Sequence, residues 1–437
     1  MDEVGNADFC IVNVYVQDNL FICPPTAVYT IAGVIETEQG DEVDDVVVHI
    51  SGSPDTEQTG SPFVFSGQPA TYDYTLAPKK EEDSDNGVTT YDLVLITRHI
   101  LGLQMLDSPY KIIAADANRS GTVSTVDMVL IRKVILGLEE NFLANTSWRF
   151  VDKDFAFANP ANPLAEVFPE VISINNLSSD QLYADFVAVK VGDVNVSAVP
   201  NHMTDGADNR EFEGLLLLSA EDRTVEAGQE YEIAFHGLNF QDILGMQFTL
   251  NLDPAKLQWL GTTSCDLPDL GPDNFGDRFA DQGRIPVSWN TASGVSMQKD
   301  DCLFTIHIKA LQTGNLLEWI HIDSGRLRTE AYRVGGALLG VHLQKETPQE
   351  EGLTLYQNRP NPFSRSTVIG FSVDRPVQGA LVVYDLSGKE VFRHAATWDK
   401  GYYELTLGRE QLPGKGMYYY KLETDAITEV RKMILVE

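Results

Sequence analysis

Polar and apolar residues alternate along most of this 437-residue chain. The clearest case is the segment LFTIHIKAL, where one face would carry Phe304, Ile306, Ile308 and Ala310, and the other Thr305, His307 and Lys309. The same period of two occurs in EYEIAFHGL and GMQFTLNLD, and in shorter runs such as VYTIAGVIET, PFVFSG and ATYDYTLAP. Successive side chains of a β-strand point to opposite faces of its sheet. The pattern therefore predicts a mainly β, multi-domain chain of consecutive immunoglobulin-like β-sandwiches.

Two stretches follow a helical period instead. They are LVLITRHILG after Asp92 and MVLIRKVILG after Asp127, and the two copies superpose at a shift of 35 residues, with Gly102 placed on Gly137. A repeat at a fixed shift indicates that one structural unit occurs twice. A glycine after the last apolar residue is a common helix C-cap. The repeat predicts one small α-helical module made of two loop-then-helix units.

The loop before the second helix carries an oxygen-bearing side chain at every second position. Asp116, Asn118, Ser120, Thr122, Ser124 and Asp127 fall at positions 1, 3, 5, 7, 9 and 12, with Gly121 at position 6. This is the ligand spacing of an EF-hand-type calcium loop, in which position 7 supplies its backbone carbonyl and the glycine takes the sharp turn. The spacing predicts a calcium site.

The first copy is less regular. With Asp92 at position 12, the preceding positions 1, 3, 5, 7 and 9 are Glu81, Asp83, Asp85, Gly87 and Thr89, and Asn86 stands at position 6. We predict a second calcium site from these residues. The ordinary alternative is that the acidic residues of both loops occupy turns and cap the helices that follow.

Residues 80 to 140 resemble a type I dockerin, because a helix follows each loop but none precedes it. The resemblance implies calcium at both loops, although Glu81 at position 1 departs from the dockerin pattern. We place the module at residues 80–200, with a tail whose strands WRFVD, FPEVISINNL and DFVAVKVGDVN would pack over the helices. Asp193 and Asn195 repeat the D-x-N opening of a calcium loop. Since neither a glycine nor a closing carboxylate follows at the right spacing, we interpret both as turn residues.

Three further segments resemble known β-sandwich families. On the segment GNADFCIVNVYVQDNLFIC, residues 1–24 resemble the end of a hyalin-repeat-like or other immunoglobulin-like module. Residues 25–79 resemble a carboxypeptidase-regulatory-like sandwich, on the order of the runs VYTIAGVIET, VDDVVVHISGS, PFVFSG and ATYDYTLAP. Residues 213–344 resemble a cohesin, on TVEAGQEYEIAF and MQFTLNLDPAKLQWLG. Dockerins and cohesins bind each other in cellulosomes. For this chain we expect an intramolecular contact or a purely structural use, and two packed neighbours without specific recognition are the simpler alternative.

The C-terminal segment resembles a different family. LYQNRPNPF carries Asn358, Pro360, Asn361, Pro362 and Phe363 in the spacing of a type IX secretion sorting domain, and GMYYYKLET and KMILVE follow as its closing strands. We assign residues 352–437 to this domain. The resemblance implies recognition by the type IX machinery of Bacteroidota-type bacteria, transit through the periplasm, and secretion or attachment to the outer-membrane surface.

Composition narrows the class of partner. The chain has 64 acidic and 32 basic residues, a net charge of −32, which argues against nucleic acid because phosphate binding requires clustered Lys and Arg. No apolar run is long enough for a membrane span. Four cysteines could pair as Cys10 with Cys23 and Cys265 with Cys302, which would suit an oxidising compartment. The opening MDEVGNADFC lacks the features of a signal peptide, so we interpret the chain as an N-terminally incomplete fragment.

Motifs of catalysis are absent from the sequence. The eight histidines are scattered, and neither H-E-x-x-H nor G-x-S-x-G occurs. Our first hypothesis is a non-catalytic, calcium-stabilised, secreted surface protein that acts in adhesion or extracellular scaffolding. The alternative is the accessory C-terminal region of a larger secreted hydrolase. A third reading makes the 213–344 sandwich a polysaccharide binder.

Overall fold

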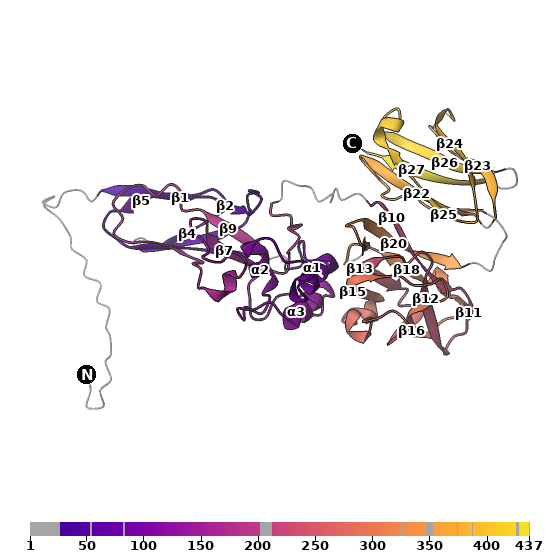
Figure 1. The fold of residues 1–437 in the computed structure, drawn as a ribbon, viewed down its shortest axis with the longest axis horizontal. Coiled ribbons are helices and arrows are strands. Elements are labelled where there is room, and N and C mark those ends of the chain that lie inside the picture. Colours follow the sequence, from indigo (N-terminus) through magenta and orange to yellow (C-terminus); the bar gives the residue numbers. More distant parts are fainter. Residues whose placement is uncertain are drawn as a thin grey trace, which may run out of the picture.

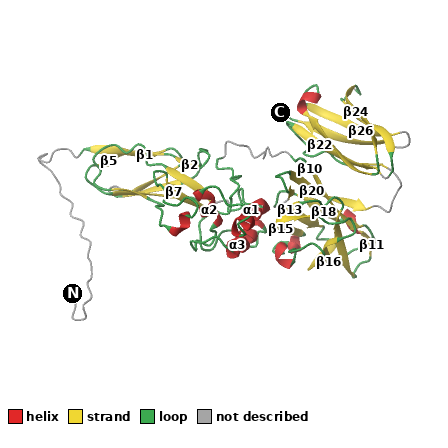
Figure 2. Cartoon of the chain, in the orientation of Figure 1, coloured by secondary structure: helices red, strands yellow, loops and turns green. Residues whose placement is uncertain are grey.

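The computed structural model describes residues 27–52, 55–81, 84–201, 212–324, 327–346, 353–373, 375–386, 388–424 and 428–436. Most elements in it are strands, and the few helices lie mainly between two β-sandwiches (Figures 1 and 2). The prediction of a mainly β, multi-sandwich chain is confirmed. The predicted module at residues 1–24 and the predicted Cys10–Cys23 pair lie outside the described residues.

The N-terminal sandwich, residues 27–81 and 147–190, is built from three small sheets. The first sheet pairs β1 (Val28–Gly33) with β5 (Phe63–Pro69). The second has the order β2 (Ile35–Thr37), β9 (Phe186–Lys190), β7 (Trp148–Asp152). The third has the order β4 (Thr56–Thr59), β3 (Val47–Ser51), β6 (Tyr74–Lys79), β8 (Ile172–Ile174). Strands β7, β8 and β9 come from the expected 80–200 module but complete the sheets of the expected 25–79 sandwich. The expected boundary at residue 79 is therefore not a boundary between sheets.

The helical segment, residues 84–142, is inserted between β6 and β7. It contains α1 (Thr90–Ile100), α2 (Pro109–Ala115) and α3 (Thr125–Ile135). Thr89 and Ser124 begin α1 and α3 with capping boxes, in which Asp92 and Asp127 bond back to the first residue. Gly102 and Gly137 follow the helix ends with positive φ, as the C-cap prediction requires. The two predicted helices are confirmed, and α2 is an element that the periodicity did not indicate.

Strands β7 and β9 lie between the hydrophobic core of the N-terminal sandwich and the core around the three helices. Phe150 and Ala188 face the N-terminal sandwich, whereas Val151 and Val189 pack against the helices. Because the side chains of a strand alternate, an almost wholly apolar strand can serve both cores at once. Strands β7 and β9 therefore pack over the helices as predicted, and they hold the N-terminal sandwich with their other face. The third tail strand, β8, was wrongly expected there: it pairs with β6 and packs in the N-terminal sandwich.

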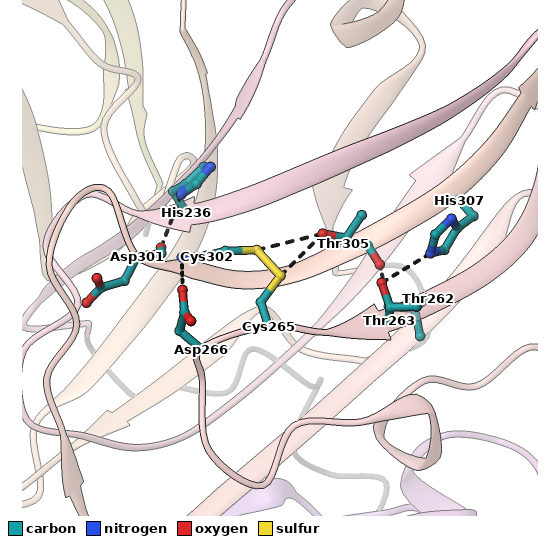
Figure 3. Close-up of a disulfide and its surroundings, with 9 residues drawn as sticks. All are labelled: His236, Thr262, Thr263, Cys265, Asp266, Asp301, Cys302, Thr305 and His307. Atoms are coloured by element: carbon teal, nitrogen blue, oxygen red, sulfur yellow. Dashed lines mark hydrogen bonds between the residues drawn. A yellow bond between two sulfur atoms is a disulfide. The ribbon is translucent and has the colours of Figure 1, made fainter.

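The central sandwich, residues 212–346, contains the longest strands. Its main sheet has the order β14 (Leu257–Ser264), β16 (Cys302–Ala310), β12 (Glu230–Gly237), β10 (Gly214–Glu221), β20 (Leu338–Glu346), β19 (Glu330–Arg333), β13 (Ile243–Leu252), β15 (Arg284–Val295), and β18 (Ile320–Asp323) also pairs with β13. The short strands β11 (Thr224–Val225) and β17 (Gly314–Asn315) pair separately. The predicted inward residues of β16 are all buried, and His307 lies on the outer face, bonded to Thr263 (Figure 3).

A disulfide joins Cys265, just after β14, to Cys302 at the start of β16, with Cα atoms 5.4 Å apart (Figure 3). The Cys265–Cys302 prediction is confirmed. Thr305 lies beside the bond, and the amide of Cys302 donates to the carboxylate of Asp266 at 3.0 Å. A disulfide at this edge fits a protein that folds in an oxidising compartment.

The sorting segment, residues 353–436, is a two-sheet sandwich. One sheet has the order β21 (Leu353–Leu355), β22 (Ser366–Val373), β25 (Gly401–Gly408), and the other β24 (Glu390–Trp398), β23 (Val377–Tyr384), β26 (Gly416–Thr424), β27 (Thr428–Leu435). Tyr418 and Tyr420 on β26 are buried while Tyr419 between them is exposed. The alternating aromatic residues fill the narrow core between the sheets.

Candidate functional site

The second loop closes around two buried carboxylates. Asp116 accepts hydrogen bonds from the amides of Ser120 and Gly121, at 2.8 and 2.9 Å. Asp127 accepts from the amides of Asn118 and Ser124, at 3.1 and 2.8 Å. The chain turns at Gly121, whose φ is +81°. The structure thus brings the predicted residues of the second loop together around one turn.

The donor set of this loop fits calcium. It offers the carboxylates of Asp116 and Asp127, the side-chain oxygens of Asn118 and Ser120, and the carbonyl of Thr122, to which Ser120 Oγ donates at 3.2 Å. Calcium takes such oxygen ligands, both charged and neutral. Among the described residues, no three His, Cys, Asp or Glu side chains lie so that they could hold one metal ion together, so a cation here would also draw on neutral oxygens. Calcium binding itself stays a prediction.

The structure separates the residues predicted for the first loop. Asp92 and Thr89 lie together, because Asp92 Oδ2 accepts from the amide of Thr89 at 2.8 Å and from its hydroxyl at 3.0 Å. Glu81 instead forms an exposed ion pair with Lys79, at 3.1 Å. Asp85 is exposed, and Asp83 lies outside the described residues.

The other carboxylate oxygen of Asp92 accepts hydrogen bonds from the tail segment that follows β9. Asp92 Oδ1 accepts from the amides of Val194 and Asn195, at 2.8 and 3.0 Å. Burial, and next the charge of Asp193, raises the pKa of Asp92 to about 8, and burial raises the pKa of Asp193 as well. Sequence reasoning set Asp193 and Asn195 aside because no carboxylate follows them, whereas the nearby carboxylate comes from far earlier in the chain. The D-x-N pattern of Asp193 and Asn195 is the sequence signal that could have indicated this contact.

Helix α1 lies against the central sandwich, on the outer face of β13 and β15 (Figure 1). The amide of Thr90 donates to Gln247 Oε1 at 2.7 Å, and the hydroxyls of Thr90 and Ser288 are 2.7 Å apart. All three residues are at most 2% exposed. The rings of Tyr91 and Tyr332 meet beside them, with centroids 5.0 Å apart. The polar outer face of this sheet is therefore buried by a helix of the same chain.

Helix α3 adds contacts to the same face. Asn290 on β15 accepts from Arg132 of α3 at 2.5 Å and donates to Thr97 Oγ1 of α1 at 3.0 Å. Burial lowers the pKa of Arg132. Beyond α3, Arg278 forms an ion pair with Glu140 at 2.7 Å and donates to the carbonyl of Gly137. The alternation in GMQFTLNLD predicted a strand but not this contact, because alternation alone cannot tell a solvated face from one covered by another module.

The N-x-P-N-P-F motif ties the start of the sorting segment to its last strand. Asn358 is fully buried and donates to Thr367 Oγ1 at 2.9 Å, and its amide donates to the hydroxyl of Tyr420. Asn361 Oδ1 accepts from the amide of Ile434 at 2.8 Å. Phe363 is buried in the core beside β27. These residues are structural elements of the domain, which explains why their spacing identifies it.

The sorting segment also contacts the central sandwich. Arg359 Nη2 donates to His342 Nδ1 at 2.7 Å, and Glu404 Oε1 accepts from the amide of Leu215 at 2.6 Å. Burial, and next the charge of Arg359, lowers the pKa of His342 to about 4. The histidine is therefore neutral at physiological pH, with Nδ1 as a hydrogen-bond acceptor.

Residues 359–437 match the family "Secretion system C-terminal sorting domain". The match confirms the predicted sorting domain, and it indicates export to the cell surface or the medium. No helix among the described residues has the length and apolar character to cross a membrane. No curated relative matches the chain.

Several solved structures match part of the chain. One is a type II cohesin–X-dockerin complex from Acetivibrio cellulolyticus, with 14% identity over 30% of this chain and 95% of that chain and a TM-score of 0.23. Another is the second type II cohesin module of the adaptor scaffoldin ScaA of the same organism, with 16% identity, 30% and 93% coverage and a TM-score of 0.23. A type I cohesin–dockerin complex from Clostridium thermocellum matches with 12% identity, 31% and 92% coverage and a TM-score of 0.23.

Proposed function

We propose that this chain is a non-catalytic, calcium-stabilised protein exported through the type IX route, which acts in adhesion or extracellular scaffolding as a stiff, surface-presented rod. The sorting match supports export. The observation that carries the mechanical role is the buried polar contact of α1 and α3 with β13 and β15. Such a contact favours one fixed arrangement, because every polar group buried there needs its own partner.

The contact also limits the kind of scaffolding. The outer face of β13 and β15 carries Gln247, Ser288 and Asn290, and all three bond to the chain's own helices. A helical partner from another protein would have to displace α1 to reach this face. The central sandwich therefore serves to fix the spacing of its own neighbours in this proposal, and recruitment of a separate partner through the same face is disfavoured.

Gly245 offers a sharp test of this arrangement. A Cβ added there would lie 3.1 Å from the carbonyl oxygen of Trp289 on β15 and 3.2 Å from methyl groups of both Thr90 and Val94 on α1. Because β15 is held by its pairing with β13, we expect a larger side chain to displace α1. In the full chain with calcium, we expect Gly245→Leu to increase the radius of gyration measured by small-angle X-ray scattering. Gln258→Leu places the same leucine side chain at an exposed site on β14 and should leave the radius unchanged.

The two outcomes differ clearly. An expanded Gly245→Leu variant that keeps the β-sheet circular dichroism of the wild type supports a chain held in one arrangement by α1. A variant with the radius of the wild type would overturn the proposal, because the helix would then not be held on this face in solution.

A further inference from the structure

The segment 193–198 repeats the backbone geometry of the first half of the second loop. Asp193 accepts from the amides of Ser197 and Ala198, at 3.1 and 2.8 Å, as Asp116 accepts from those of Ser120 and Gly121. The residue before each serine has a positive φ, +59° at Val196 and +55° at Arg119. The tail thus supplies the D-x-N-x-S opening of a loop in the calcium-loop conformation.

The end of the same loop comes from the first repeat. Asp92 accepts from the amides of Asn195 and Thr89, as Asp127 accepts from those of Asn118 and Ser124. Ser197 Oγ donates to the carbonyl of Gly87 at 2.9 Å, as Ser120 Oγ donates to that of Thr122 at 3.2 Å. Every position of the second loop that would contribute a ligand therefore has a counterpart, although the counterparts belong to two segments.

The two segments cross at Gly87. A Cβ on Gly87 would lie 2.4 Å from the Cα of Ala198, and φ at Gly87 is +75°, so only glycine fits this crossing. The side chain of Asn86 bonds to both the carbonyl and the amide of Val199, at 2.8 and 3.0 Å. These bonds hold the tail against the start of the first helix unit.

One side-chain atom at this place points to a ligand independently. Asn195 Oδ1 is buried, and it has no hydrogen-bond partner in the described part of the chain. A buried carbonyl oxygen without a partner is costly. Asn195 stands at position 3, whose side-chain oxygen faces the ion in a calcium loop. In the second loop the matching Asn118 Oδ1 accepts from the amide of Ser120, at 3.0 Å.

We propose that the first calcium site is a split loop, assembled from the tail and the first repeat. Its ligands are the side-chain oxygens of Asp193, Asn195, Ser197, Thr89 and Asp92 and the backbone carbonyl of Gly87. Glu81 and Asp85, which the sequence suggested for positions 1 and 5, have no part in it. Calcium here ties the end of the module to the start of α1, where Thr90 contacts the central sandwich. This assignment is independent of the surface role proposed above.

Counting bound calcium tests the split loop. The full chain, stripped with a chelator and dialysed against micromolar calcium, should bind two calcium ions per chain. Asp193→Asn should bind one, Asp127→Asn should bind one, and the double variant none. The variant Glu81→Gln, Asp85→Asn should still bind two, since Glu81 pairs with Lys79 and Asp85 is exposed.

Asn195→Ala provides the matched variant if Asp193→Asn does not fold. Asn195 Oδ1 has no hydrogen-bond partner among the described residues, so removal of the side chain should preserve the fold and weaken one of the two sites at least tenfold in a calcium titration. Two contrary results would overturn the proposal: two tight sites in both Asp193→Asn and Asn195→Ala, or loss of one ion in the variant Glu81→Gln, Asp85→Asn. Asp127→Asn should remove only the ion of the second loop. A failure of the second loop to bind calcium can therefore be told apart from a failure of the split loop.

Discussion

The amide of Thr90, at the first turn of α1, donates a hydrogen bond of 2.7 Å to the side chain of Gln247 on the central sandwich. Amides in the first turn of a helix have no partner within the helix. Gln247 therefore caps a helix that belongs to a different module. Since both residues are buried, the cap cannot be replaced by solvent without opening the contact.

We expect Gln247→Ala to destabilise the contact between α1 and the sandwich by about 1–3 kcal/mol, because it leaves a buried donor without an acceptor. Calorimetry of the full chain should show an unfolding transition at a lower temperature than in the wild type. Gln258→Ala, at an exposed site of the same sandwich, should leave the transition unchanged. Equal effects of the two substitutions would mean that the Thr90 cap contributes nothing.

Calcium removal should lower the melting temperature of the region from residue 84 to residue 201. A loop with a dissociation constant of ~1 μM in about 1 mM calcium would stabilise the folded module by roughly 4 kcal/mol. Asp127→Ala should abolish the part of this response that belongs to the second loop. If a chelator leaves the melting temperature of the wild type unchanged, the calcium prediction is wrong for both loops.

The contact of His342 with Arg359 should weaken in acid. The pKa of His342 in the folded chain, about 4, lies below the ordinary value of 6.5. Its contribution is therefore complete above about pH 6.5 and is lost as the pH falls toward 4. Between these pH values, the melting temperature of the sorting segment should fall more steeply in the wild type than in His342→Gln.

His342→Gln is the matched control because its side-chain oxygen can still accept from Arg359 but does not titrate. Burial raises the pKa of Glu404 in the same contact, and this group titrates equally in both proteins. Parallel pH profiles for the two proteins would show that protonation of His342 does not govern the contact.

Val196 is a β-branched residue in the left-handed region, with φ at +59°. Such a conformation costs roughly 1–2 kcal/mol for a residue with a Cβ. We expect Val196→Gly to stabilise the chain by up to about 1 kcal/mol, after the entropy of the added glycine is counted. Val194→Gly, two residues earlier at a buried position, should instead destabilise it. A destabilised Val196→Gly would contradict the backbone geometry assigned to the tail.

Local patterns in the sequence predicted the local structure well. The period of two in LFTIHIKAL placed Phe304, Ile306 and Ile308 in the core, and the period after Asp127 predicted α3. The N-x-P-N-P-F motif predicted the sorting domain because Asn358 and Phe363 are fixed by the fold of that domain itself. In each case the residues that carry the pattern are neighbours in the sequence.

Contacts between distant segments were not predictable in the same way. Strand β8 joins the sheet of β6, and Asp92 meets Asn195, over separations that no local pattern reports. Gln247 and Ser288 alternate with apolar neighbours as solvent-facing residues do, and only the docked helix shows that they are buried. The first loop looks irregular in the sequence because the residues that match the second loop come from two distant segments, which only the fold brings together.

The most direct test of the central claim, that the helical segment is bound by the central sandwich, uses the ion pair of Arg278 and Glu140. The two side chains are 2.7 Å apart and both are accessible to solvent. In Arg278→Lys, a zero-length carbodiimide reagent should join the new amine to the carboxylate of Glu140, and mass spectrometry of the digested monomer should identify the linked peptides. The link should be absent when Glu140→Gln is added. A monomeric Arg278→Lys variant that yields no link between positions 278 and 140 would contradict the account.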